Sequence, residues 1–393
     1  MRILFRGRVH SLAGDSNSLL VEGGAITWVG KGRPPRRPQE VVVTGPGELI
    51  APGFIDLQVN GFGGHDAATG TAAIAAISQL LPATGVTAFL PTLISAPVEI
   101  GVGFTAAAGA AAARAKGARV LGSHLEGPFI NRAFLGAHEL KCLADPTSEQ
   151  VDVIAQARPR LVTLAPELPG GLDAIARLRA ARVVVSAGHT GADFDCGRAA
   201  IAAGVRFGTH IFNAMTPVHH RRPGIALALL LDPKVTVGLI SDGEHVHPAV
   251  WEQVVRAKGA SHVALTTDQT AAAGMPVGSY MLSGQRVVSD GAAVRLEDGT
   301  LAGSVATMDH LVRRMSELPG MNVARAIGMA STVPARVLGE RSLGRILVGA
   351  CADLVVLDRD RRVRLTMVGG EVKFRRRGVH REPAPAASAG RAT

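Results

Sequence analysis

Short apolar segments alternate with alanine-rich segments through the middle of the chain, and this alternation restricts the fold more than any other feature. The apolar segments are typical of buried strands, and intervening segments such as 71–85 and 170–181 are typical of helices. Strands that are joined by helices run parallel, so the pattern predicts a parallel sheet. The expected strands are 53–60, 86–92, 119–129, 161–167, 182–190, 206–214, 235–245 and 262–270.

About eight strands of this kind favour a closed α/β barrel over an open sheet. The alternative is a doubly wound sheet, but no Gly-x-Gly-x-x-Gly follows the first strand, as dinucleotide binding would require. The chain has 393 residues and 47% of them are apolar, which is enough for a large barrel with a smaller accessory unit.

Both ends of the chain carry strand patterns. Residues 1–50 hold short apolar runs separated by turns, and Gly23 with Gly24 predicts a hairpin. Residues 345–380 repeat this style, so we expect strands from both ends to pair in one small β-unit outside a barrel that spans 51–344. The tail, 381–393, is rich in proline, alanine and serine and is expected to be disordered.

Charge and cysteine content narrow the class of protein. The net charge of +10 comes largely from arginines near the two ends, and it would suit nucleic acid or a small anionic substrate. Aromatic residues are not interleaved with this charge, which argues against nucleic acid. The three cysteines form no paired motif, which predicts a reducing cytoplasm. No signal peptide and no apolar run long enough for a bilayer are apparent, so no membrane partner is expected.

A carboxylate or an imidazole lies toward the carboxyl end of each of five expected strands. These residues are Glu126, His189, His210, His245 and Asp268. Barrel enzymes place their catalytic groups at the carboxyl ends of strands. One such residue would usually be an ordinary side chain, but five at the same topological position predict a functional site.

Three of these residues predict a metal site. Glu126, His189 and His210 supply one carboxylate and two imidazoles, a set that catalytic zinc uses with a position left open for water. Zn, Fe, Mn, Co and Ni all accept such ligands, so the set does not choose the metal. Asp268 follows the last strand and is placed to take a proton from water and return it to a leaving nitrogen. The structural alternative for Asp268 is a helix N-cap or a turn at the strand end.

A second cluster, residues 212–224, is suited to an anion. It offers backbone N–H groups around Asn213 and Ala214, followed by His219, His220, Arg221 and Arg222. Arginine matches the geometry of phosphate, and His245 is placed to join from the next strand. The alternative is a solvated basic loop.

These motifs resemble those of the N-acetylglucosamine-6-phosphate deacetylases, a family within the amidohydrolase superfamily. The matching segments, in family order and over nearly the whole chain, include PGFIDLQVNGFGG (52–64), GSHLEGPFIN (122–131), SAGHTGAD (186–193), GTHIFNAM (208–215), TTDQTAAAGMP (266–276) and LAGSVATMDH (301–310). The resemblance implies a distorted (β/α)8 TIM barrel with a β-sandwich formed by both termini. It implies hydrolysis of the acetamide of N-acetyl-D-glucosamine 6-phosphate to D-glucosamine 6-phosphate and acetate.

The resemblance also implies roles for individual residues. Glu126, His189 and His210 would hold the metal, and Asp268 would be the acid/base. His138 would hold or polarise the acetamide carbonyl. The residues implied to contact the substrate are Ala137, Asn213, Ala214, Arg221, His245, Leu301, Ala302 and Gly303. Members of the family are commonly homodimers, in which the arginine that binds phosphate can come from the partner subunit.

The first expected strand bears on the number of metal ions. Family members with His-x-His on this strand hold two metals, and members with Gln-x-Asn hold one. Gln58 and Asn60 therefore imply one divalent ion per subunit, with zinc the first choice. Two segments depart from the family pattern: Gln269 and Thr270 after the acid/base, and Val333 to Ala335 near the C-terminus. Gln269 lies close enough to Asp268 in sequence to affect substrate preference.

Several other functions stay open. The substrate could be the galactosamine epimer, a cyclic amide or an N-acyl amino acid, and the barrel could be an inactive scaffold. The basic cluster argues against a cyclic amide, and the complete set of ligands and acid/base argues against a scaffold. A nucleic-acid binder would need an affinity that falls with salt.

Overall fold

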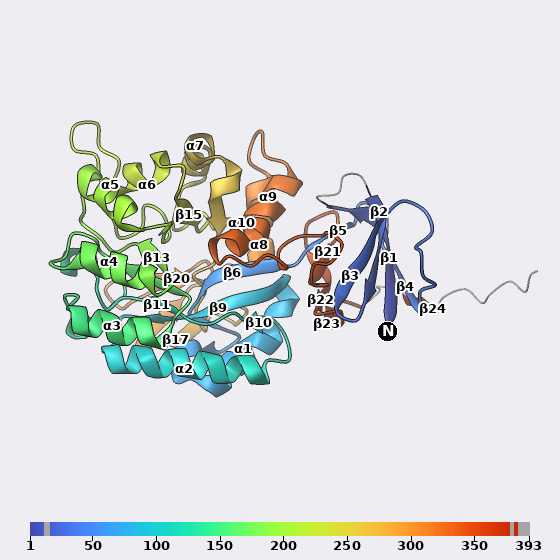
Figure 1. Ribbon diagram of the computed structural model, residues 1–393, viewed down its shortest axis with the longest axis horizontal. Helices are drawn as coiled ribbons and strands as arrows, with labels where there is room; N and C mark the ends of the chain where they lie inside the picture. The colour runs from blue at the N-terminus through green and yellow to red at the C-terminus, as the bar shows by residue number, and fades with distance from the viewer. Residues whose placement is uncertain (12–15, 378–380, 384–393) are drawn as a thin grey trace, which may run out of the picture.

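The computed structural model of the protein describes residues 1–11, 16–377 and 381–383. Two lobes are visible in Figure 1: a large one in which helices surround a sheet, and a smaller all-β one built from the blue and red ends of the chain. The chain passes from a strand of the small lobe, Leu49–Pro52, directly into a strand of the large lobe, Phe54–Val59, so the two lobes are joined without a long linker.

The large lobe is a parallel β-barrel, as the alternation predicted. Within the described residues, eight strands follow one another around it, with β6 beside β9 at the start and β16 at the end. These strands are β6 (Phe54–Val59), β9 (Val86–Ile94), β11 (His124–Glu126), β12 (Leu161–Leu164), β13 (Val184–Ala187), β14 (Phe207–Gly208), β15 (Thr236–Leu239) and β16 (Val263–Leu265). A short extra strand, β10 (Arg119–Val120), pairs with the other edge of β9.

Helices cover the outside of the barrel between successive strands. The expected helix at 71–85 is α1 followed by a 3-10 turn, and the one at 170–181 is α4. The helices are α1 (Thr71–Leu80), α2 (Val98–Arg114), α3 (Ser148–Ala157), α4 (Gly171–Ala180), α5 (Phe194–Ala203), α6 (Ile225–Leu231), α7 (Pro248–Lys258), α8 (Met308–Ser316), α9 (Val323–Ala330) and α10 (Thr332–Val337). Their buried faces and the outer faces of the strands form the main hydrophobic core.

The barrel closes through the residues that follow β6 and β16. The amide of Asp268 donates to the carbonyl of Gln58 at 3.0 Å, and the amide of Asn60 donates to the carbonyl of Gln269 at 2.9 Å. Gln58, Asn60 and Asp268 are therefore brought side by side although they are far apart in sequence. The side chain of Gln269 is buried behind this seam.

The smaller lobe is a branched sheet made from both ends of the chain. Strand β1 lies at its centre, pairs with β2 on one side, and meets β4 and then β5 on the other. Strand β21 pairs with β5, which joins the C-terminal strands to the N-terminal ones. The strands are β1 (Arg2–Val9), β2 (Ser16–Glu22), β3 (Ala25–Gly30), β4 (Glu40–Val43), β5 (Leu49–Pro52), β21 (Leu354–Leu357), β22 (Val363–Val368), β23 (Glu371–Arg375) and β24 (Arg381–Pro383).

The expected fold class, a distorted barrel with a small β-sandwich from both termini, is confirmed as a barrel with an additional sheet domain. Strand β5 ends at Pro52, so the terminal sheet extends slightly past residue 50. Strand β24 pairs with β4, so the first residues of the tail expected to be disordered are ordered by strand pairing. Residues 384–393 of that tail lie outside the described part of the chain. Among the helices of the described ranges, none has the length and apolar character that crossing a membrane requires.

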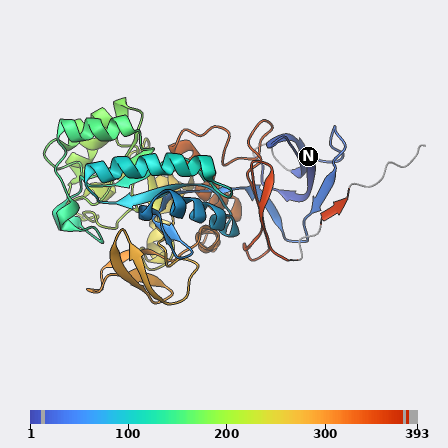
Figure 2. The ribbon, with the colours of Figure 1, turned by 90° about the horizontal axis from the view of Figure 1, so that it is seen from below.

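A four-stranded antiparallel sheet follows the last barrel strand, where the sequence pattern predicted no separate unit. It projects from the large lobe in Figure 2 as the orange strands. Its strands are β17 (Gly278–Leu282), β18 (Gln285–Ser289), β19 (Ala293–Arg295) and β20 (Leu301–Ser304). The amide of Ser283, in the turn between β17 and β18, donates to the buried carboxylate of Asp66 at 2.6 Å, which fixes this sheet against the mouth of the barrel.

Candidate active site

A cavity of about 330 Å³ opens at the carboxyl ends of the barrel strands. It collects polar side chains from β11, β13, β14, β15 and β16, together with apolar ones from β9, β17 and β20. The residues that line it are Asn60, Ile94, Glu126, Ala133, Phe134, Leu135, Gly136, Ala137, His138, His189, His210, Asn213, Ala214, His245, Asp268, Leu282, Thr300, Leu301, Ala302 and Gly303. All of the site residues predicted from the sequence therefore line this one cavity, except Arg221.

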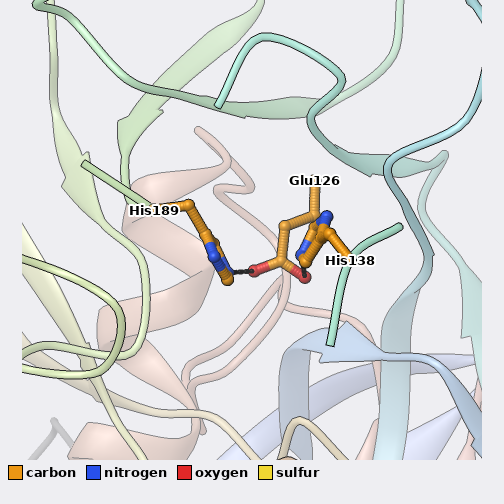
Figure 3. A group of neighbouring side chains, drawn as sticks. All are labelled: Glu126, His138 and His189. Carbon is orange, nitrogen blue, oxygen red and sulfur yellow. Dashed lines mark ion pairs between the residues drawn. The ribbon is translucent and has the colours of Figure 1, made fainter. Parts of the chain in front are cut away.

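Glu126, at the end of β11, lies at the centre of this cavity. Its Oε1 atom is 2.9 Å from Nε2 of His210 and 3.3 Å from Nε2 of His189. Nε2 of His138 approaches the other oxygen at 3.9 Å. Figure 3 shows His138 and His189 converging on the carboxylate from two sides. All four side chains are buried, so their charges are poorly screened by water.

The hydrogen bonds of His189 determine which of its nitrogens is free. Its Nδ1 atom lies 2.8 Å from the carbonyl oxygen of Phe134. A carbonyl only accepts hydrogen bonds, so Nδ1 carries the proton and Nε2 presents a lone pair toward Glu126. Two groups that both present lone pairs need a proton or a metal cation between them.

His210 meets the same carboxylate oxygen, and its environment leads to the same conclusion. Burial is the largest influence and lowers the pKa of its imidazole, but the hydrogen bond to Glu126 and the negative charges of Glu126 and Asp268 together outweigh burial, so the pKa is raised above its usual value. The carboxylate of Glu126 therefore favours a positive charge next to its Oε1 atom. A divalent cation would supply that charge in place of the proton, and one carboxylate with two imidazoles is a donor set that suits it.

His138 carries its proton on the opposite nitrogen. The backbone N–H of Ser95 donates to its Nδ1 atom at 3.0 Å, so Nδ1 is an acceptor and Nε2 bears the hydrogen. Burial, followed by the nearby His189, holds the pKa of His138 well below its ordinary value, which keeps the ring neutral. His138 lies close enough to Glu126 and His189 to be counted as a possible ligand. Its tautomer instead makes it a hydrogen-bond donor into the cavity.

Asp268 follows β16 and faces the same space. Burial, and then the negative charge of Glu126, raise its pKa to about 6. The side-chain amide of Asn60 donates to its Oδ1 atom at 2.7 Å. Similarly, the amide of Gln58 donates to Oε1 of Glu126 at 3.0 Å. The two amides of the first strand therefore act as hydrogen-bond donors to the two carboxylates of the site.

His245 is fixed by a carboxylate of its own. Its Nδ1 atom lies 2.7 Å from Oδ2 of Asp242, and both side chains are nearly inaccessible to solvent. Because the carboxylate accepts the Nδ1 hydrogen, Nε2 is left for a ligand. In the loop that follows β14, the side-chain amide of Asn213 donates to the carbonyls of His210 and Ile211 at 3.2 and 3.3 Å, which holds that loop in place.

The basic loop that the sequence assigned to an anion lies outside the cavity. His219, His220, Arg221 and Arg222 are not among the lining residues, and Arg221 is exposed. The rings of His219 and His220 stack with their centroids 4.6 Å apart. In a single chain, therefore, Arg221 does not reach the residues around Glu126. Gln269 does not line the cavity either, and its side chain is buried.

Sequence reasoning missed several residues that complete the site. Ser95 sets the tautomer of His138, and the loop around Phe134 holds His189. Ile94 and Leu282 add apolar wall to the cavity. A signal existed for Ser95, since it follows the second barrel strand in the same way that Glu126 follows the third, but serine at a strand end is too common to stand out.

Comparisons with known proteins agree with this geometry. The sequence profile of the amidohydrolase family matches residues 49–373. The chain is 36% identical to N-acetylglucosamine-6-phosphate deacetylase of Bos taurus, over 91% of this chain and 94% of that one. It is also 36% identical to N-acetylgalactosamine-6-phosphate deacetylase of Escherichia coli O157:H7, over 91% and 95% of the two chains. The crystal structure of N-acetyl-D-glucosamine-6-phosphate deacetylase from Mycobacterium smegmatis is similar with a TM-score of 0.87 and 33% identity, and covers 95% of this chain and 99% of that one.

Proposed function

The chain belongs to the amidohydrolase family, and from this premise we propose that it hydrolyses the acetamide of N-acetyl-D-glucosamine 6-phosphate to D-glucosamine 6-phosphate and acetate. One observation carries the proposal. A single cavity holds two imidazole nitrogens around a carboxylate, a neutral imidazole that donates a hydrogen bond, and a second carboxylate with a raised pKa. Amide hydrolysis needs each of these groups.

We assign the metal to Glu126, His189 and His210, with one divalent ion per subunit. The donor roles of Gln58 and Asn60 support a single ion, because their amide N–H groups face the carboxylates that a second cation would need. Zinc suits one carboxylate and two imidazoles, and iron, manganese, cobalt and nickel are the alternatives. When bound, the ion supplies Lewis acidity, which lowers the pKa of water and polarises a carbonyl.

The proton transfers fall to Asp268. An aspartate with a pKa of about 6 is ionised at neutral pH and still basic enough to take a proton from water as it attacks the acetyl carbon. The protonated carboxyl then returns that proton to the nitrogen as the C–N bond breaks. Asn60 keeps the carboxylate oriented through both steps.

His138 stabilises the charge that develops on the acetyl oxygen. Its Nε2–H is fixed toward the cavity by the bond between Nδ1 and Ser95, so the donor needs no reorientation during the reaction. Ala137, Leu301, Ala302 and Gly303 surround the acetyl group. At Gly303, φ is +87°, and a Cβ atom there would come within 2.7 Å of the carbonyl oxygen of Asp268, so glycine allows this close approach.

The sugar and its phosphate bind on the other side of the cavity. We assign them to Asn213, Ala214 and His245, together with Arg221. Because Arg221 is exposed and away from the cavity of its own chain, we infer a homodimer in which the arginine reaches the site of the partner subunit. Arg221→Ala is then expected to raise KM for the phosphorylated sugar and to leave kcat nearly unchanged.

The galactosamine epimer is the second candidate substrate. The similarity to an N-acetylgalactosamine-6-phosphate deacetylase is as high as that to the glucosamine enzyme of Bos taurus, so sequence identity does not separate the two sugars. A cyclic amide and an inactive scaffold have no comparable support. We also propose a cytoplasmic enzyme, because all three cysteines lie in the described residues as free thiols.

Acetate release tests the function. The purified protein, loaded with zinc, is assayed with both 6-phosphate epimers and with unphosphorylated N-acetylglucosamine. We expect the glucosamine 6-phosphate derivative to have the highest kcat/KM, and Asp268→Asn to lose activity by orders of magnitude while still binding metal. Equal rates with and without the phosphate would contradict the anion site, and near-normal turnover of the Asn variant would remove Asp268 from its role.

A further inference from the structure

Glu167 joins two loops of the site, although it does not line the cavity. It lies just beyond the end of β12, and its side chain is partly buried. Its Oε1 atom accepts hydrogen bonds from the side-chain amide of Asn131 at 2.8 Å and from the backbone N–H of Gly191 at 2.6 Å. Its Oε2 atom accepts from the hydroxyl of Thr190 at 2.5 Å. Three neutral donors from two different loops therefore converge on one carboxylate.

These two loops are the ones that hold His189. The backbone N–H of Asn131 donates to the carbonyl of His189 at 2.9 Å, and Nδ1 of His189 donates to the carbonyl of Phe134 at 2.8 Å. The backbone of His189 is left-handed, with φ of +50°, which is unfavourable for a residue with a side chain and persists only if its surroundings impose it. Thr190 and Gly191 follow directly, so Glu167 holds the chain just after His189, and through Asn131 it also holds the loop that contacts His189.

The contact between the loops is too close to tolerate a shift. A Cβ atom on Gly191 would lie 2.9 Å from the ring of Phe134 and 3.1 Å from the side-chain amide of Asn131. The loop 131–136 therefore presses against the segment 189–191. If Glu167 were removed, the N–H of Gly191 and the amide of Asn131 would lose their common acceptor, and only the hydrogen bonds of His189 to Asn131 and Phe134 would still join the two loops.

We propose that Glu167 is a positioning residue that sets the direction of the Nε2 lone pair of His189 and thereby the affinity of the site for its cation. The proposal rests on the proposed function, since it needs the cation to be held by His189. Groups that orient metal-binding imidazoles through their hydrogen bonds commonly change metal affinity or activity by about 10- to 100-fold when they are removed. Glu167 does not bond to the imidazole of His189 itself. It acts one hydrogen bond further away, through the loops that carry His189 and its acceptor, the carbonyl of Phe134.

Two substitutions separate shape from charge. Glu167→Ala removes all three hydrogen bonds. Glu167→Gln keeps the shape and one oxygen for Asn131 and Gly191, while its amide faces the Thr190 hydroxyl. Asp193→Asn is the matched control, because Asp193 lies on the same segment but only caps α5 through the N–H of Cys196.

The measurement uses the metal-free protein. Zinc affinity is obtained by competition with a chelator, and Co²⁺ is added as a spectroscopic probe, whose visible absorption reports the geometry of its ligands. For Glu167→Ala we expect zinc binding to weaken by about 10-fold or more and the Co²⁺ spectrum to change. For Glu167→Gln we expect affinity within a few-fold of wild type, and for the control no change.

Two results would overturn the proposal: wild-type zinc affinity with an unchanged Co²⁺ spectrum in Glu167→Ala, or equal weakening in the control. Should Glu167→Ala fail to fold, Thr190→Val removes one donor alone, and unchanged affinity in that variant would count against the proposal in the same way. A wild-type protein that binds no zinc would sink the proposed function instead, so the two failures are distinguishable.

Discussion

At the scale of single residues, His138 and His189 show how one carboxylate is surrounded by two imidazoles with opposite roles. The backbone N–H of Ser95 makes Nδ1 of His138 an acceptor, while the carbonyl of Phe134 makes Nδ1 of His189 a donor. The first ring therefore points an N–H into the cavity and the second points a lone pair. In the proposed mechanism, a neutral donor for an oxyanion and a ligand for a cation thus arise from the same residue type, through the different contacts of the two Nδ1 atoms.

The raised pKa of Asp268 predicts an acid limb in the pH profile. Burial and the charge of Glu126 raise this pKa from 3.8 to about 6, and the base must be ionised to accept a proton. Activity is therefore retained above the folded pKa and lost as the pH falls through it. A cation on Glu126 offsets the second cause, so in the metal-loaded enzyme kcat/KM should fall below a pH between 3.8 and about 6.

The measurement is kcat/KM against pH with zinc in excess, so that loss of metal at low pH is not mistaken for titration of the base. Asp268→Asn is the control, and its residual activity should lack this limb. A limb that persists in the Asn variant would assign the titration to another group.

The hydrogen bond from Asn60 predicts a second effect on the acid/base. Asn60→Ala removes the 2.7 Å bond to Asp268, and bonds to charged groups contribute about 1.5–3 kcal/mol. We expect kcat to fall by about 10-fold or more, because a carboxylate that is free to rotate is seldom aligned for proton transfer. KM and zinc content should stay the same. A variant with less than a twofold change in kcat would show that Asp268 needs no support from the first strand.

The sequence predicted most of the site because its residues share a topological position. Glu126 ends a strand, and His189, His210, His245 and Asp268 each come after one. Parallel strands bring these ends together, so the grouping can be predicted without any knowledge of side-chain contacts. Ser95, Gln58, Asn60 and Glu167 were missed in their actual roles, because each acts through a hydrogen bond to a residue far away in sequence. Such hydrogen-bond partners can be identified only when the three-dimensional alignment of the strands is known.

At the scale of elements, the sheet β17–β20 completes the cavity on its apolar side. Leu282 from β17 and Ala302 from β20 pack with Ile94 and Ala137 in one buried cluster. The side-chain amide of Gln285 donates to the carbonyl of Ala137 at 2.9 Å, which ties the sheet to the residue beside His138. This sheet therefore forms the apolar wall of the cavity, the side to which we assigned the acetyl group. The alternation of strands and helices could not reveal it, because its short antiparallel strands interrupt that alternation.

The wall predicts the acyl preference. Leu282→Ala opens room for two further methylenes, each of which contributes about 0.8 kcal/mol on burial. We expect the ratio of kcat/KM for N-butyryl-glucosamine 6-phosphate to that for the N-acetyl sugar to rise by about 10-fold. Val288→Ala, on the exposed side of the neighbouring strand at 42% exposure, is the matched control and should leave the ratio unchanged. An unchanged ratio in Leu282→Ala would place the acyl group elsewhere in the cavity.

At the scale of the whole molecule, the two lobes were predicted with unequal detail. Apolar strands separated by alanine-rich helices are a local pattern, so the barrel could be predicted from the sequence. The pairing of β5 with β21 joins residues about three hundred positions apart, and nothing in either strand specifies that register. Groups buried where the two lobes meet add contacts that hold this pairing in place.

The clearest of these groups is Asp353, which precedes β21 and is 2% exposed. It accepts from Nε and Nη2 of Arg119 at 3.0 and 3.2 Å, and from the N–H of Gly369 at 2.6 Å. Arg119 belongs to β10 of the barrel, and Gly369 follows β22 of the terminal sheet. One carboxylate therefore joins the two lobes.

Asp353→Asn is expected to destabilise the protein without affecting catalysis. It keeps an acceptor for Gly369 but leaves the Arg119 guanidinium, whose side chain is 38% exposed, without its counter-charge. The expected loss is about 1–3 kcal/mol, toward the lower end because water reaches the arginine. It is measured as a lower Tm, with kcat and KM unchanged because the ion pair does not line the cavity.

Arg36→Ala is the control. It breaks an exposed ion pair with Glu22 in the terminal sheet and should leave Tm unchanged. A Tm of Asp353→Asn equal to wild type would show that strand pairing alone holds the lobes together, and a fall in kcat would show that the terminal sheet supports the geometry of the active site.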